Sequence, residues 1–118
     1  MQKPPFYKSL LYSIKGVFWM LKSERNFQLE VLALIVNLFL IVYFELNSTD
    51  AALIILVCFL VLITEALNTA VEKICDFVEP NFNKKIGLIK DIAAGAVILA
   101  TFLSIIVGIL VYSNYFFN

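Results

Sequence analysis

Four polar side chains recur on one face of an expected helix in the middle of the chain. Within the segment EALNTAVEKICD, they are Glu65, Asn68, Glu72 and Asp76. The α-helical period places all four on one stripe. The segment begins inside a long apolar run, and carboxylates are costly in lipid, so an acid at this position indicates a functional site. The alternative is a polar seam that only joins helices, as Asn and Thr side chains can do.

Carboxylates in this arrangement could serve two chemical tasks. Glu72 and Asp76 should reach the water edge, where they would suit Mg²⁺, a hard cation that takes oxygen ligands and shares them with phosphates. Glu65 should lie deeper, which suits a general base. A base, a metal site and nearby basic residues are the components of phosphoryl transfer. The four glycines form neither a P-loop nor a kinase glycine-rich loop.

The composition is that of an integral membrane protein. Of the 118 residues, 62% are hydrophobic and 15% are charged, whereas soluble domains average roughly 45–50% apolar residues. A soluble core of this size could not bury so much apolar surface. The chain has no histidine, which removes the commonest catalytic base and the commonest zinc ligand.

The hydrophobic pattern predicts an all-α membrane protein that forms one domain over residues 1–118. Apolar residues at helical spacing predict an N-terminal amphipathic helix over about 8–22, lying on the membrane surface. Longer apolar runs predict three transmembrane helices, over about 28–46, 51–72 and 88–112. The second run continues to residue 78, so its last turns should project into water. A short turn is expected at 45–50.

The basic residues are sorted to one side of this arrangement. All nine lie in the N-terminal region or near the 77–89 loop: Lys3, Lys8, Lys15, Lys22, Arg25, Lys73, Lys84, Lys85 and Lys90. The expected turn at 45–50 and the C-terminal tail carry none. The positive-inside rule therefore predicts a multi-pass membrane protein with the N-terminus in the cytoplasm and the C-terminus outside.

Four blocks follow one another along most of the chain: YSIKG at 12–16, SERNFQLE at 23–30, EALNTAVEKICD at 65–76 and KDIAAGAV at 90–97. Together they resemble the small prokaryotic diacylglycerol kinase and undecaprenol kinase family. The resemblance implies a homotrimer of three-span subunits that uses Mg²⁺ and ATP to phosphorylate the hydroxyl of a membrane lipid alcohol, with no nucleic-acid partner. The AAGAV within the last block is closer to the undecaprenol kinase branch. It favours the polyprenol as substrate, with diacylglycerol also used.

The resemblance also assigns roles to matching positions. Glu65 would be the base that takes the proton from the lipid hydroxyl, while Glu24 and Glu72 would hold Mg²⁺ on the ATP phosphates. The nucleotide site would include Tyr12, Asn68, Asp76, Asn81, Phe82, Asn83, Lys90 and Asp91. The lipid side would include Asn26, Phe27, Gln28 and Glu30. Two positions depart from the family pattern: Pro5 stands where the best-known diacylglycerol kinase has a nucleotide-binding Arg, and Asn83 where a His is common.

Two other classes of function remain open. A small ion-coupled transporter could use Glu65 as its ion site. Such a site needs access from both sides of the membrane, but the outer half of that helix, 51–63, has no series of polar side chains that would provide it. A non-enzymatic assembly subunit could use the stripe only to join helices. Such a subunit would not need Glu72 and Asp76 beyond the hydrocarbon.

Overall fold

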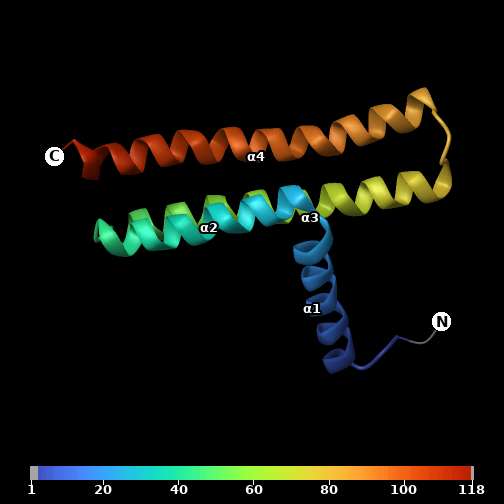
Figure 1. Ribbon diagram of the computed structural model, residues 1–118, viewed down its shortest axis with the longest axis horizontal. Helices are drawn as coiled ribbons and strands as arrows, with labels where there is room; N and C mark the ends of the chain where they lie inside the picture. Colours follow the sequence, from blue (N-terminus) through green and yellow to red (C-terminus); the bar gives the residue numbers. More distant parts are fainter. Residues whose placement is uncertain (1–2, 118) are drawn as a thin grey trace.

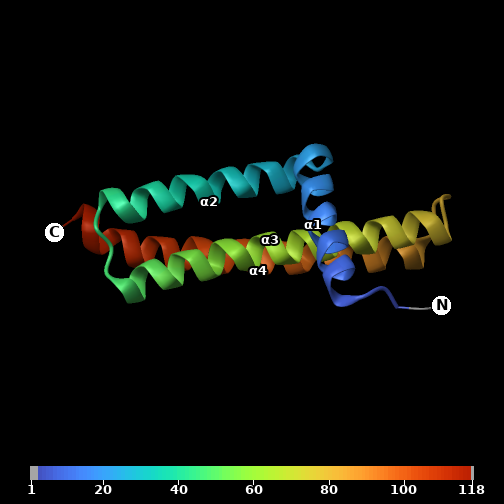
Figure 2. The same cartoon turned by 90° about the horizontal axis from the view of Figure 1, so that it is seen from below.

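The computed structural model describes residues 3–117 and consists there of four α-helices. They are α1 (Phe6–Ser23), α2 (Arg25–Tyr43), α3 (Ser48–Val78) and α4 (Lys84–Phe116). The three longer helices run alongside one another, with α2 and α4 each packed against α3, while α1 projects away from them at a steep angle (Figure 1, Figure 2). The molecule is elongated, with principal extents of 55 × 39 × 21 Å.

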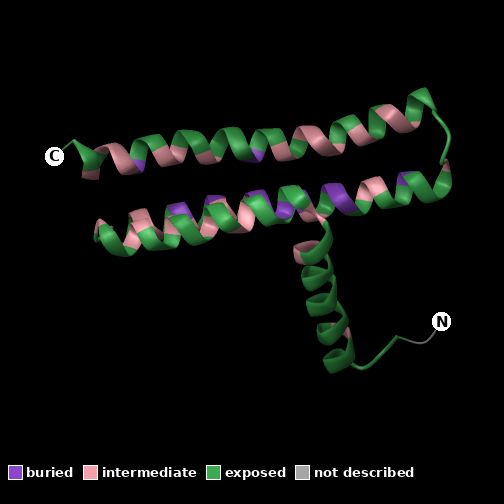
Figure 3. Cartoon of the chain, viewed as in Figure 1, coloured by how far each residue is buried: buried purple, intermediate pink, exposed green. Residues whose placement is uncertain are grey.

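The helices α2, α3 and α4 are each long and apolar enough to cross a membrane. Their outer faces are exposed over most of their length (Figure 3) and carry large apolar side chains, among them Val42 and Leu99, exposed by 77% and 72%. Such a surface is suited to lipid tails rather than to water. The all-α architecture with three candidate spans and an N-terminal helix is the one that the sequence predicts.

The connection between α2 and α3 differs from the prediction by a few residues. The first predicted span reaches residue 46, but α2 ends at Tyr43, and the turn occupies 44–47 rather than 45–50. Asn47 sets the start of α3, because its Oδ1 accepts a hydrogen bond of 2.8 Å from the backbone nitrogen of Asp50. Glu45 completes the turn with a φ of 54°.

A second asparagine sets the start of α4. The Oδ1 of Asn83 accepts hydrogen bonds from the backbone nitrogens of Lys85 and Ile86, at 2.9 and 3.2 Å. The helix therefore begins at Lys84, before the predicted span at 88, and it continues beyond 112 to Phe116. At its other end α3 runs to Val78, as its long apolar run predicts.

The small core is centred on α3, which lies between the other two long helices. The buried apolar side chains are Ile54, Val57, Val61, Leu62 and Cys75 of α3, Phe27 of α2, and Ala100 and Val111 of α4. A direct bond also joins α2 to α4, because the hydroxyl of Tyr112 donates to Oδ1 of Asn37 at 2.7 Å. The packing of α2 and α4 against α3 thus turns the polar stripe of α3 toward the inside of the bundle.

Candidate functional site

The polar stripe of α3 runs from a buried end to an exposed end. Glu65 and Thr69 are each 5% exposed and Asn68 is 8% exposed. Glu72 is half-buried, and Asp76 near the end of the helix is exposed. A polar stripe of this kind follows from the helical period of the sequence. The burial of Glu65, Asn68 and Thr69 follows from the position of α3 between α2 and α4.

The joint between α1 and α2 brings further polar groups to Glu65. Glu24 is the single residue between these helices, and its side chain caps neither of them. The side chain of Asn26 hydrogen-bonds the Glu65 carboxylate, and Glu24 and Glu72 lie close enough to interact with that carboxylate electrostatically. Glu30 interacts with it as well. Carboxylates gathered in this way repel one another, so a bound cation would stabilise the arrangement.

The donor set between Asn68 and Glu72 suits Mg²⁺. Nδ2 of Asn68 donates to Oε1 of Glu72 at 3.4 Å, while Oδ1 of Asn68 is buried without a hydrogen-bond partner. Unpaired buried acceptors are uncommon, and amide oxygens are ligands for hard cations. Within 3–117, no three His, Cys, Asp or Glu side chains are grouped tightly enough to hold a metal by themselves. Mg²⁺ bound with phosphates needs only one or two protein carboxylates, so the residues fit.

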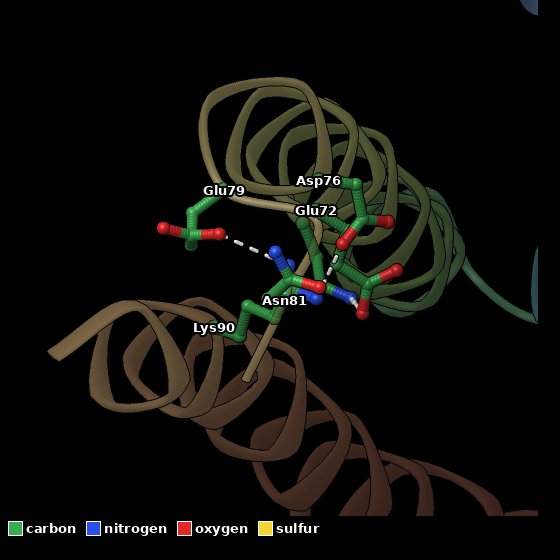
Figure 4. Close-up of polar contacts among 6 residues, drawn as sticks. Glu72, Asp76, Glu79, Asn81 and Lys90 are labelled. Carbon is green, nitrogen blue, oxygen red and sulfur yellow. Dashed lines mark hydrogen bonds and ion pairs between the residues drawn. The ribbon is translucent and has the colours of Figure 1, made fainter. Parts of the chain in front are cut away.

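The exposed end of the stripe is tied to α4. Nζ of Lys90 lies 2.6 Å from Oδ1 of Asp76, and both side chains point into the space between α3 and α4 (Figure 4). The connecting loop is held by Glu79, whose Oε1 accepts a hydrogen bond of 3.1 Å from the backbone nitrogen of Asn81. This end therefore offers a positive charge next to the carboxylate of Glu72, within reach of water.

Other residues expected at the nucleotide are placed less closely together. The side chain of Asn83 caps α4, Phe82 is 95% exposed, and Asp91 is exposed on α4. Tyr12 lies on α1, with Nζ of Lys15 at 5.8 Å from the centre of its ring. In both views of the chain, α1, which carries Tyr12, lies apart from the connection between α3 and α4 (Figure 1, Figure 2).

Two hollows adjoin the residues expected to contact lipid. One of about 280 Å³ lies among α2, α3 and α4, and it is lined in part by Leu29 and Glu30, whose Oε1 is buried and unpaired. The other, of about 270 Å³, lies beneath the α1–α2 joint and includes Phe27. Gln28 has a different partner, because its Nε2 donates to the carbonyl oxygen of Leu21 at 2.8 Å.

Two residues outside the predicted site also shape this region. Thr69 is buried one turn after Glu65, and the signal for it was its place four residues further along the same helix face. Glu79 fixes the loop through Asn81, and its position directly before Pro80 was a turn signal.

Comparison with known proteins gives consistent results. Residues 11–112 match the family model described as Prokaryotic diacylglycerol kinase. The chain is 32% identical over 106 residues to a diacylglycerol kinase of Synechocystis sp., covering 89% of this chain but only 61% of that protein. It is 31% identical over 107 residues to the undecaprenol kinase of Bacillus subtilis, covering 91% and 87% of the two chains. It is 28% identical over 109 residues to the diacylglycerol kinase of Escherichia coli strain K12, covering 92% and 89%.

Proposed function

The chain belongs to the prokaryotic diacylglycerol kinase family, and from this we propose that it is a lipid kinase. It transfers the γ-phosphate of ATP to the hydroxyl of a membrane lipid alcohol, diacylglycerol or undecaprenol. The observation that carries the proposal is the placement of Glu65, which is buried on α3 beside Asn26 and flanked by the carboxylates of Glu24 and Glu72.

In the proposed reaction Glu65 is the general base. The lipid hydroxyl oxygen attacks the γ-phosphorus, the bond from that phosphorus to the bridging oxygen breaks, and ADP leaves while the hydroxyl proton passes to Glu65. The hydrogen bond from Asn26 orients the Glu65 carboxylate toward the substrate. A buried base is well placed for this step, because the hydroxyl of a lipid hangs at the level of the head groups rather than in bulk water.

We assign Mg²⁺ to Glu24 and Glu72, supported by Asn68. When bound, the cation neutralises charge on the phosphates of ATP. Asp76 holds Lys90 at the exposed end of the stripe, where its ammonium group can meet phosphate oxygens. The loop residues Asn81, Phe82 and Asn83, together with Asp91 and Tyr12, complete the proposed nucleotide site. Asn26, Phe27, Gln28 and Glu30 form the proposed lipid side.

The proposed assembly is a homotrimer in the bacterial inner membrane, with the N-terminus in the cytoplasm and the C-terminus outside. The separation of Tyr12 from the 79–83 loop within one chain supports an assembly in which neighbouring copies complete each site. The distribution of Lys and Arg supports the orientation.

The direct test uses purified protein in bilayers with Mg²⁺ and γ-labelled ATP, followed by separation of the lipid products. We expect label in a lipid phosphate, and a decrease of about 10²–10⁴-fold in the Glu65→Gln variant, because an amide cannot accept the proton. Glu45→Gln is the matched control, since Glu45 lies in the turn at the opposite end of α3. Absence of label from every lipid would overturn the kinase proposal, and near-normal turnover by Glu65→Gln would overturn the base assignment.

A further inference from the structure

The position of Glu24 relative to α3 depends on the direction in which α1 leaves the joint. Glu24 is the single residue between α1 and α2, and its extended backbone, with φ −106° and ψ 110°, turns the chain sharply there. Glu72 lies on a different helix, α3. When the ψ angle of Glu24 changes, its side chain turns together with α1. A swing of α1 about that bond therefore moves the Glu24 carboxylate relative to Glu72.

No residue of α1 is buried, so few contacts hold the direction of this helix. A hollow of about 270 Å³ lies under the joint and is lined by apolar side chains, among them Val17, Leu21, Phe27 and Leu62. Apolar contacts are non-directional, and contacts around a void are fewer than in a closely packed core. The angle of α1 thus needs directed contacts to fix it.

Two directed contacts meet this need. Nε2 of Gln28 donates to the carbonyl oxygen of Leu21 at 2.8 Å, which braces α1 against the neighbouring helix α2. Nζ of Lys73 lies 5.2 Å from the centre of the Trp19 ring, within the range of a cation–π interaction, and this contact joins α1 to α3. Lys73 directly follows Glu72 in the sequence, and Trp19 lies in the last turns of α1, close before Glu24.

We infer that Trp19 and Lys73 form a positioning pair that sets the distance between the carboxylates of Glu24 and Glu72. This inference rests on the proposed function, in which those two carboxylates hold Mg²⁺. Neither member of the pair touches substrate. The cation over the indole ring holds the last turns of α1 against α3. The Mg²⁺ concentration that the enzyme requires for activity reports whether α1 is held in this position.

The test compares Lys73→Met, which keeps the length of the side chain and removes its charge, with Lys73→Arg, which keeps a cation for the ring. We expect Lys73→Met to raise the Mg²⁺ concentration for half-maximal activity and the KM for ATP roughly two- to fivefold, the size expected for an exposed cation–π contact, with kcat nearly unchanged. Lys73→Arg should keep both values close to those of the unmodified chain. Lys8→Met is the matched control, because it removes one charge from an exposed position near the other end of α1.

The fluorescence of Trp19 gives an independent measurement, because it is the only tryptophan of the chain. Its emission should shift in Lys73→Met and remain unchanged in Lys8→Met. A shift of the emission without any change in the Mg²⁺ requirement would overturn the inference, as would a fall in kcat alone or a failure of Lys73→Arg to keep the requirement of the unmodified chain. An unmodified chain that phosphorylates no lipid would instead overturn the proposed function, and the inference with it.

Discussion

Nζ of Lys90 lies 2.6 Å from Oδ1 of Asp76 and joins the last turns of α3 to the first turns of α4. The two side chains are 37% and 61% exposed, and exposed ion pairs contribute little to stability. In the proposed site the pair has another use. It holds a positive charge beside Glu72, where the phosphates of a nucleotide would lie in the proposed site.

Lys90→Met should consequently affect catalysis more than folding. We expect kcat/KM for ATP to fall roughly ten- to a hundredfold, the effect of losing one hydrogen bond to a charged group, while the thermal unfolding temperature hardly changes. Lys84→Met, at the exposed start of the same helix, is the control and should keep normal kinetics. Loss of thermal stability with unchanged kinetics would show that the ion pair is structural.

The metal assignment predicts a specific rescue. Glu24→Ala or Glu72→Ala should raise the Mg²⁺ concentration for half-maximal activity roughly tenfold or more, and excess Mg²⁺ should restore part of the activity, because one of few protein ligands has been removed. Glu45→Ala at the opposite end of α3 should behave like the unmodified chain. An equal loss of activity at every Mg²⁺ concentration would mean that these carboxylates have another role.

The hydrogen bond from Tyr112 to Asn37, at 2.7 Å, lies between helices that cross the membrane. Bonds of this kind average about 0.6 kcal/mol in membrane proteins. Tyr112→Phe should destabilise the fold by about that amount and leave kinase activity intact, because neither residue belongs to the proposed site. A double-mutant cycle with Asn37→Ala, followed by unfolding in detergent, measures the coupling; strictly additive effects would show that the bond contributes nothing.

Much of this fold could be predicted because a membrane imposes simple rules on sequence. Apolar runs of sufficient length predict α2, α3 and α4, and the spacing of Glu65, Asn68 and Glu72 predicts their common face. The helix ends were less accurate, because the side chains of Asn47 and Asn83 set them, whereas hydropathy only indicates how much of a helix can lie in lipid.

The angle of α1 and the neighbours of Glu65 could not be derived from helical periodicity. They depend on the single extended residue Glu24 and on contacts between segments far apart in the sequence, such as Asn26 with Glu65. Periodicity describes one helix at a time. The family resemblance grouped these residues in advance, but the capping role of Asn83 and the bond from Gln28 to Leu21 appear only in the structure.

The orientation in the membrane can be tested by labelling of introduced cysteines. Ser48 is exposed at the start of α3, and Phe82 is exposed in the loop before α4. In a chain whose two native cysteines are replaced by Ala, Ser48→Cys should react with an impermeant reagent added outside the cell, and Phe82→Cys should react only after the membrane is opened. Phe82 is preferable to Asn83 for this purpose, because replacing Asn83 would remove the cap of α4. The reverse labelling would invert the proposed topology.

The final prediction concerns the choice of lipid. Diacylglycerol has ester carbonyls that need hydrogen-bond donors, whereas undecaprenol has a primary hydroxyl and one long apolar chain. At the start of α2 the amide of Asn26 is bound to Glu65, and that of Gln28 is bound to the carbonyl of Leu21.

Each of these amide groups has two N–H donors, and one of the two is already engaged, so few donors remain for the ester carbonyls. A buried carbonyl left unpaired costs about 1–3 kcal/mol. We expect undecaprenol to be the preferred substrate, with diacylglycerol also used. Both lipids are supplied at equal mole fraction to the purified enzyme, and the two phosphorylated products are separated and counted. A kcat/KM ratio that favours diacylglycerol by tenfold, about 1.4 kcal/mol of transition-state preference, would reverse this assignment and show that water or backbone groups satisfy the ester carbonyls.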